Sequence, residues 1–148
     1  MLTALGCCET ALYPYVAGQI TRPTPAQIAN ALQYKTGADH RIGSLSDFLR
    51  CLADAAPWPV TVAFTVYDSF MSQVADTGVM PMPQPGEQGG HEVLCLGYDQ
   101  TKQLALIENS WGVGWGQRGY FWMPFGVINA PDTDLWMVHT VHTGGPWK

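Results

Sequence analysis

The sequence is poor in basic residues: only seven of its 148 residues are Lys or Arg, and its formal net charge is −5. Because these seven are scattered, no basic face is predicted that could neutralise the phosphates of a nucleic acid or an anionic lipid surface. No apolar run approaches the ~18 residues of a membrane-spanning helix, and residues 1–5 lack the basic start and the length of a signal sequence. We therefore expect neither nucleic acid nor a membrane as a partner.

Cysteine is also scarce, and its spacing excludes two common uses. The four cysteines form neither the paired CxxC knuckles that bind zinc nor a dense disulfide framework. They are Cys7, Cys8, Cys51 and Cys95. The adjacent Cys7 and Cys8 could form disulfides with other partners, act as a reactive pair, or pack as two small apolar side chains. We expect no metal site and no cofactor.

Apolar residues make up 47% of the chain, which is enough for one ordinary domain to bury a core of its own. Helices are predicted in the first half. Thr24 as N-cap, followed by Pro25, predicts a helix that runs to Gly37. A second helix is predicted to begin at Ser44, in a segment that resembles a capping box, and to end at Pro57.

Strand patterns dominate the second half. Residues 60–67 alternate in the period of a strand that has one face in the core. The segment 78–90 is too rich in proline and glycine for a regular element and is predicted to be a loop. The further predicted strands are 91–98 and 103–109, joined by a hairpin turn, then 119–123 and 135–142. The expected fold class is α+β, an antiparallel and barrel-like sheet preceded by helices.

The predicted hairpin brings two polar side chains within range of each other. If it closes with a three-residue loop, so that Tyr98 faces Lys102, His91 lies directly opposite Asn109. A two-residue loop would shift the register by one and turn the two side chains to opposite faces. In the first case the amide oxygen of Asn109 could hold one tautomer of the imidazole, as a general base requires.

Two segments around these residues carry the most specific pattern in the chain. They are GGHEVLCLGYD at 89–99 and IENSWGVGWGQRGYF at 107–121. Together they resemble the histidine strand and the asparagine-serine-tryptophan-glycine segment of the papain family of cysteine peptidases. Further similar segments are ETALYPY at 9–15, PVTV at 59–62, VYDSFM at 66–71 and YFWMPF at 120–125, the last two being especially similar to bacterial and phage members.

The resemblance implies a fold and a set of roles. Residues 1–56 would be the helical remainder of the first papain lobe, and residues 57–148 the β-rich second (right-hand) lobe. His91 would be the general base and Asn109 the residue that orients it. Trp111 would shield their hydrogen bond from water.

The resemblance also implies a peptide or protein as the substrate or partner. Val60 and Glu92 match positions near the pocket for the second substrate side chain, and Gly89 and Gly90 match the edge along which a peptide backbone binds. Glu92 departs from the small apolar residue that is usual after the histidine, so a purely hydrophobic pocket is not expected.

The family's nucleophile lies N-terminal to every segment matched here, in a Cys-Gly-Ser-Cys-Trp type of sequence at a helix start. None of the four cysteines has that setting. The first hypothesis is therefore a cysteine peptidase component whose thiol comes from another chain or from further sequence, and which is inactive alone. The alternative is a degenerate papain-like module that binds an assembly partner or builds a structure such as a phage particle.

Overall fold

The structure is a computed structural model that describes residues 5–19, 21–54 and 58–142, without the side chains of residues 139–142. The chain divides into two compact units, residues 1–39 with 138–148 (unit 1) and residues 40–137 (unit 2). Within the described residues, no helix is long and apolar enough to cross a membrane. The expected division into residues 1–56 and 57–148 follows the papain lobes, and it stays a prediction.

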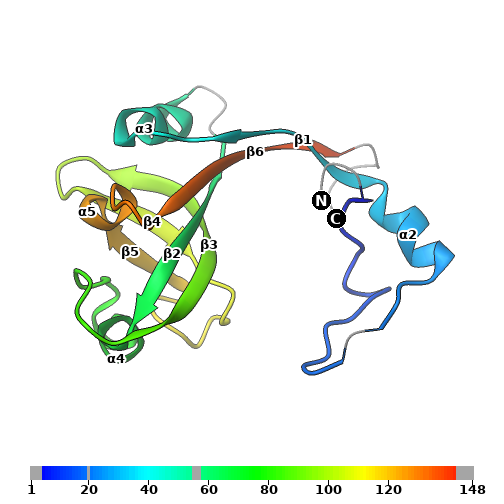
Figure 1. The fold of residues 1–148 in the computed structure, drawn as a ribbon, viewed down its shortest axis with the longest axis horizontal. Helices are drawn as coiled ribbons and strands as arrows, with labels where there is room; N and C mark the ends of the chain where they lie inside the picture. Colours follow the sequence, from blue (N-terminus) through cyan, green and yellow to red (C-terminus); the bar gives the residue numbers. More distant parts are fainter. Residues whose placement is uncertain (1–4, 20, 55–57, 143–148) are drawn as a thin grey trace. The chain divides into compact units, whose positions relative to one another are not determined.

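In the described residues, six strands form one sheet in the order β1-β6-β2-β3-β4-β5, and three helices of unit 2, α3, α4 and α5, pack against its strands (Figure 1). The strands are β1 (Tyr34–Arg41), β2 (Val60–Tyr67), β3 (Glu87–Asp99), β4 (Leu104–Glu108), β5 (Tyr120–Pro124) and β6 (Asp134–His142). The helices are α2 (Pro25–Ala31), α3 (Leu45–Ala53), α4 (Asp68–Thr77) and α5 (Phe125–Ile128). The predicted α+β class is confirmed, and the antiparallel sheet is not closed into a barrel.

The core lies on one face of the sheet. Val60, Val62, Phe64 and Val66 of β2 are buried in alternation with half-buried neighbours, as the sequence period predicts. The helix α3 adds Phe48 and Leu52 to the same core. This core belongs to unit 2 and supports the strands that carry the candidate site.

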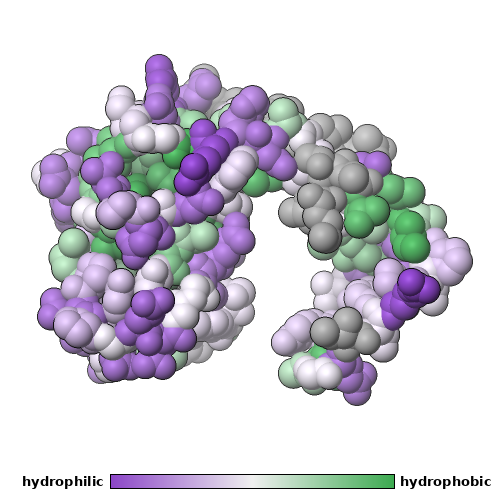
Figure 2. Space-filling model, viewed as in Figure 1, coloured by the Kyte–Doolittle hydropathy of each residue, from purple (hydrophilic) through white to green (hydrophobic). Residues whose placement is uncertain are grey.

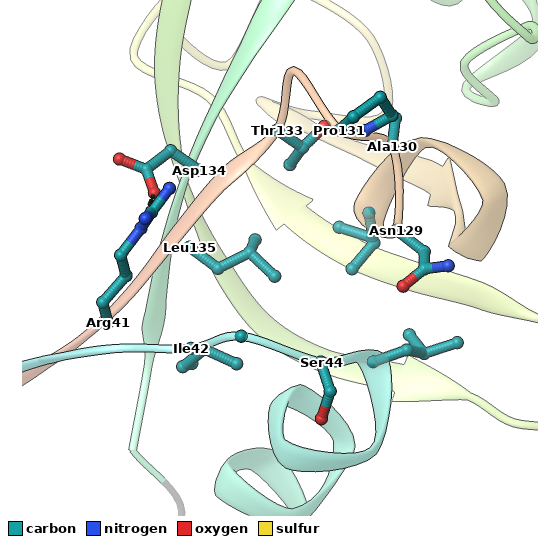
Figure 3. Close-up of a pocket in the computed structure, with 12 residues that line it drawn as sticks. Arg41, Ile42, Ser44, Asn129, Ala130, Pro131, Thr133, Asp134 and Leu135 are labelled. Atoms are coloured by element: carbon teal, nitrogen blue, oxygen red, sulfur yellow. Dashed lines mark hydrogen bonds and ion pairs between the residues drawn. The ribbon is translucent and has the colours of Figure 1, made fainter.

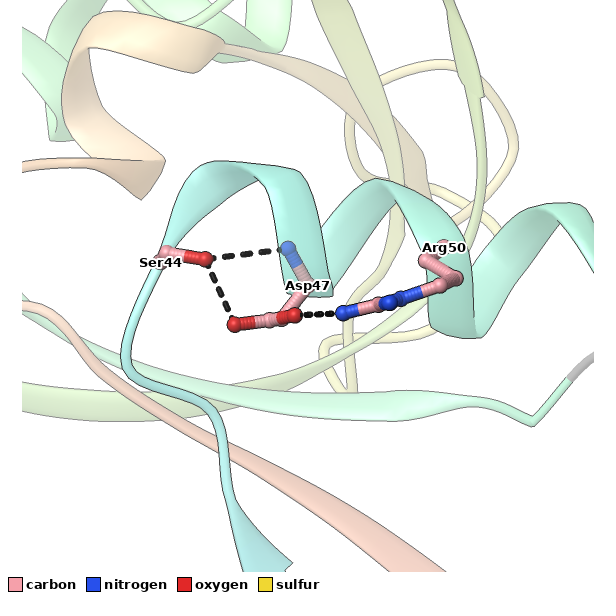
Figure 4. Close-up of polar contacts among 3 residues, drawn as sticks. All are labelled: Ser44, Asp47 and Arg50. Carbon is pink, nitrogen blue, oxygen red and sulfur yellow. Dashed lines mark hydrogen bonds and ion pairs between the residues drawn. The ribbon is translucent and has the colours of Figure 1, made fainter.

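The start of α3 follows the predicted capping pattern. The Ser44 hydroxyl accepts the backbone N–H of Asp47 at 3.1 Å and donates to the Asp47 carboxylate at 2.7 Å (Figure 4). Arg50 lies one turn further on and pairs with the same carboxylate. The Ser44 hydroxyl first, and then Arg50, hold the pKa of Asp47 below its usual value.

The first predicted helix is shorter than expected. Thr24 and Gln27 form the capping box of α2, but the helix ends at Ala31 and not near Gly37. Residues 34–41 form β1 instead, because pairing with β6 outweighs the local helical pattern.

The predicted loop at 78–90 is also shorter, because β3 begins at Glu87. Gly89 and Gly90 pair with Val66 and Thr65 of β2, so the partner strand orders residues that local composition assigns to a loop. A bulge follows at the end of β2, where Tyr67 faces Glu87.

Candidate active site

His91 and Asn109 are joined by a hydrogen bond. His91 is half-buried on β3, and Asn109, which directly follows β4, is 7% exposed. The distance from His91 Nε2 to Asn109 Oδ1 is 2.9 Å, and the same oxygen accepts the backbone N–H of Ser110 at 2.8 Å. Because Oδ1 is an acceptor, His91 Nε2 carries the proton, and the neutral imidazole presents an unprotonated Nδ1. That is the tautomer of a general base acting through Nδ1.

The hairpin closes with neither a two-residue nor a three-residue loop, although the bond between His91 and Asn109 forms. Asp99 faces Leu104, so the loop is residues 100–103 and not three residues long. That loop alone would put His91 and Asn109 on opposite faces, but an irregularity between Cys95 and Gly97 shifts the pairing by one. Asn109 therefore lies diagonally from His91, at a spacing that long side chains bridge.

The segment after β4 fixes the Asn109 backbone. Its N–H donates to the Gly119 carbonyl at 2.9 Å, and the Gly119 N–H donates to the Trp115 carbonyl at 2.7 Å. Gly116 has a φ of +53°, and a Cβ there would lie 2.7 Å from the Tyr120 carbonyl oxygen. The glycine-rich sequence thus allows the tight loop that presents Asn109 to His91.

Aromatic rings flank the imidazole. The Trp111 ring stacks on His91 with centroids 5.0 Å apart and an interplanar angle of 25°, and it is 40% exposed. Phe64, which faces His91 across β2 and β3, contacts it edge-on at 6.0 Å. This contact of Phe64 could not be predicted from the sequence alone, because it depends on the β2–β3 register.

The other predicted site residues are not all brought together. Glu92 is exposed on the sheet face opposite the core, where its pairing partner is Ala63. Val60 lies on the core face, where it is fully buried and pairs with Cys95. The side chain beside Glu92 on β2 is therefore that of Ala63, three residues beyond Val60.

A hollow of about 370 Å³ lies beside His91. Its lining includes Gly90, Glu92, Asp132 and Asp134, so it is acidic as well as partly apolar. The Trp136 indole N–H donates to Asp134 at 2.9 Å and, with Arg41 as the smaller cause, holds the pKa of Asp134 below its usual value.

A second hollow in unit 2 contains neither His91 nor Asn109. It lies between the start of α3 and the segment that joins α5 to β6 (Figure 3). Ile42 and Leu135 contribute apolar side chains, and Arg41 and Asp134 pair at 2.7 Å at its edge. Apolar residues also show at the surface of unit 2 between α3 and α5 in Figure 2. This hollow is not the candidate active site, because its lining residues include no pair of a general base and an orienting residue.

The cysteines of unit 2 are poorly suited to act as nucleophiles. Cys95 is fully buried on β3, and burial raises the pKa of its thiol to about 12. Burial also raises the pKa of Cys51 on α3. Cys7 and Cys8 belong to unit 1 and precede a turn in which the N–H groups of Leu12 and Tyr13 donate to the Glu9 carbonyl. Within the described residues, all four cysteines are free thiols, and no cluster of side chains is arranged to hold a metal ion.

Known proteins that are similar in sequence to this chain include cysteine peptidases and peptidase-like proteins. An uncharacterized peptidase C1-like protein of Acanthamoeba polyphaga mimivirus is 38% identical over 89 residues, covering 57% of this chain and 29% of that protein. A cathepsin B-like protein of Giardia intestinalis is 32% identical over 130 residues, covering 81% of this chain and 42% of that protein. The chain thus spans less than half the length of these two relatives.

Among solved structures, xylellain, a cysteine protease from Xylella fastidiosa, matches with a TM-score of 0.82 and 31% identity. The match covers 95% of this chain and 59% of the xylellain chain. The model of the papain family cysteine proteases matches residues 2–133, which is most of the sequence and includes both His91 and Asn109. With the hydrogen-bonded histidine and asparagine already in place, these similarities lead to one conclusion: the chain belongs to the papain family of cysteine proteases.

Proposed function

We propose that this chain carries the general base and the orienting amide of a papain-like cysteine peptidase, and that its nucleophilic thiol comes from outside its own four cysteines. The observation that carries the proposal is the 2.9 Å bond between His91 Nε2 and Asn109 Oδ1. That bond leaves Nδ1 as the basic nitrogen, and no hydrogen bond occupies Nδ1 among the described residues. A placement among bacterial and phage-like members is part of the proposal, and the similarity to xylellain supports it.

The chemistry follows from this tautomer. His91 Nδ1 takes the proton of the incoming thiol, and the thiolate attacks the carbonyl carbon of a peptide bond. The imidazolium then gives the proton to the leaving amine as the C–N bond breaks. Water, deprotonated by the same nitrogen, hydrolyses the thioester and regenerates the thiol. Asn109 accepts the Nε2–H throughout, so that the ring keeps its orientation.

The residues around His91 supply places for a peptide. Gly90 borders the hollow beside His91, and no backbone or side-chain atom lies within 4 Å of where its Cβ would be. A substrate backbone has room to approach along Gly89 and Gly90, and the adjoining side-chain pocket includes Ala63 and Glu92. Trp111 covers the imidazole and keeps water from the Asn109 bond. Because Glu92 and Asp132 both line the hollow, we expect it to favour polar or basic side chains over purely apolar ones.

The state of the described cysteines supports a thiol from elsewhere. Cys95 has a pKa of about 12 and lies in the core, so its thiolate is scarce and enclosed. Cys7 and Cys8 are followed by a turn and not by a helix, so they lack the setting of the family's nucleophile. Alone, the chain is expected to hydrolyse no peptide, and thiol-directed peptidase inhibitors should label its cysteines no faster than they label an unperturbed thiol.

The decisive experiment supplies the thiol. We would join the nucleophile-bearing N-terminal segment of a papain-family peptidase to this chain and measure hydrolysis of a peptide library. Hydrolysis should appear, and His91→Ala should lower kcat by ~10³-fold or more, since the base is a member of the catalytic unit. His40→Ala, at an exposed histidine, is the matched control and should leave kcat unchanged.

A folded chimera without activity would contradict the proposal. That outcome, together with capture of a defined assembly partner, would favour the alternative of a degenerate module with a binding or structural role. Rapid stoichiometric labelling of Cys7 or Cys8 that His91→Ala abolishes would show instead that the thiol lies within this chain.

A further inference from the structure

The imidazole of the candidate base and three other aromatic rings contact one another in a closed ring of four side chains. His91 contacts Phe64 at 6.0 Å and Trp111 at 5.0 Å between ring centroids. Phe70 contacts the same two rings, Phe64 at 5.4 Å and Trp111 at 5.8 Å. Phe70 therefore touches both rings that flank the imidazole, and among the described residues it has no ring contact with the imidazole itself.

Phe70 is well anchored in this position. It lies in the first turn of α4 and is 1% exposed. Its ring also contacts Trp115 at 5.7 Å and Phe121 at 5.3 Å, which ties it to the loop after β4 and to β5. A side chain held from several elements can transmit that rigidity to the rings it touches.

Trp111, by contrast, depends on its inner neighbours. It is 40% exposed, and its ring contacts other than His91 are to Phe70 and to Trp115 at 5.1 Å. Loss of the Phe70 ring would leave space beneath both Trp111 and Phe64. Trp111 could then sink toward the core and away from His91, because filling an apolar void is favourable.

We propose that Phe70 is a positioning residue for His91, which holds Phe64 and Trp111 against the imidazole and so keeps water from the bond between His91 Nε2–H and Asn109. The inference rests on the proposed function of His91 and extends it to a residue with no contact to substrate. It assigns α4 a role in the active site.

The test measures how fast the His91 Nε2 proton exchanges with water in the ¹⁵N-labelled full chain, with His91→Gln used to assign the signal. In Phe70→Leu the exchange should be about tenfold faster or more, or too fast to observe, because the cover over the bond is lost. Phe70→Met, which fills more of the site but has no ring, should show the same acceleration and gives the answer if Phe70→Leu does not fold.

Phe121→Leu is the matched control. Phe121 is fully buried and contacts Phe70 and Trp115, but it has no ring contact with Phe64, His91 or Trp111 among the described residues. Its exchange rate should stay within about twofold of wild type. If the His91 Nε2 proton exchanges equally fast in Phe70→Leu and Phe121→Leu, the acceleration comes from general destabilisation of the core. That result would overturn the proposal.

The outcomes also separate this inference from the proposed function. A wild-type chain with a slowly exchanging Nε2 proton that neither Phe70 variant affects would overturn the positioning role and leave the base and orienter pair intact. A wild-type chain with no such proton would overturn both.

Discussion

The two compact units of this chain differ in what they bury. The buried apolar residues of the core, from Ile42 to Leu135, all belong to unit 2. In the described part of unit 1, no residue is buried. Several of its large apolar side chains are instead substantially exposed: Leu5, Leu12, Tyr15, Val16, Ile28 and Leu32. Figure 2 shows apolar surface around α2.

The difference separates a unit with a buried apolar core from a unit whose described residues include none that is buried. Unit 2 has helices and a sheet that bury each other's apolar faces, as a stable domain requires. The described part of unit 1 has local structure, including the capping box of α2 and the bond from Tyr34 to Glu9 at 2.7 Å, but no buried residue. The candidate base His91 and its orienter Asn109 both belong to unit 2, which has the buried core.

The largest expected contrast is in thiol reactivity. Cys7 is exposed in unit 1, whereas Cys95 is enclosed in the core of unit 2. At pH 8 a thiol with a pKa of about 12 is only ~10⁻⁴ ionised, and reagent cannot reach it without opening of the core. Mass spectrometry after maleimide treatment should show Cys95 reacting at least ~10³-fold more slowly than Cys7. Comparable rates would mean that unit 2 is not a closed core.

Core truncations should affect the two units unequally. Phe48→Ala removes a fully buried ring from unit 2 and should lower the free energy of unfolding by about 3–5 kcal/mol. Leu32→Ala changes a side chain that is 43% exposed in unit 1 and should stay within about 0.5 kcal/mol of wild type. Urea titrations of both variants provide the check. A large loss in Leu32→Ala would show that unit 1 is already buried against a partner.

Removing the N-cap of one helix in each unit should also affect the stability of the two units differently, by a smaller amount. Ser44→Ala removes the cap of α3 and should cost about 1 kcal/mol of the free energy of unfolding. Thr24→Ala removes the cap of α2 and should change helix content locally without shifting the main transition, because α2 has no buried residues. Circular dichroism during thermal unfolding measures both. Equal shifts of the midpoint would indicate that the two units unfold together.

The smallest expected effect is a pH dependence in unit 2. The Ser44 hydroxyl, and then Arg50, lower the pKa of Asp47 in the folded state. A lowered folded pKa stabilises the fold above the unfolded pKa, and this contribution is lost as the pH falls through the folded pKa. Asp47→Asn should therefore be slightly destabilising at pH 7 and neutral in strong acid. Asp76→Asn, at an exposed carboxylate of α4, is the matched control variant.

Much of unit 2 follows from the sequence because its patterns are local. The alternation of β2, the cap of α3 and the linked histidine and asparagine motifs each depend on neighbouring residues, and the structure has all three. The likeness to a known family extended these patterns to the α+β fold. These local patterns exist because each helix or strand must present one apolar face to the common core.

What the sequence did not predict depends on contacts between distant segments. The β1 strand replaced a predicted helical continuation because β6 pairs with it. The bulge between Cys95 and Gly97, together with the loop at 100–103, set a register that no turn residue specified. The contact of Phe64 with His91 follows from the pairing of β2 with β3. None of these leaves a local signal in the sequence.

We propose that Asn109 holds His91 in the tautomer that makes Nδ1 the base, and one spectrum tests this role most directly. In the ¹⁵N-labelled wild-type chain, at a pH where the imidazole is neutral, the signals of His91 should show a protonated Nε2 and an unprotonated Nδ1. In Asn109→Ala the Nε2 proton should exchange rapidly and its signal should be lost, because its acceptor is gone. A wild-type spectrum with the proton on Nδ1, or one that Asn109→Ala leaves unchanged, would contradict the account.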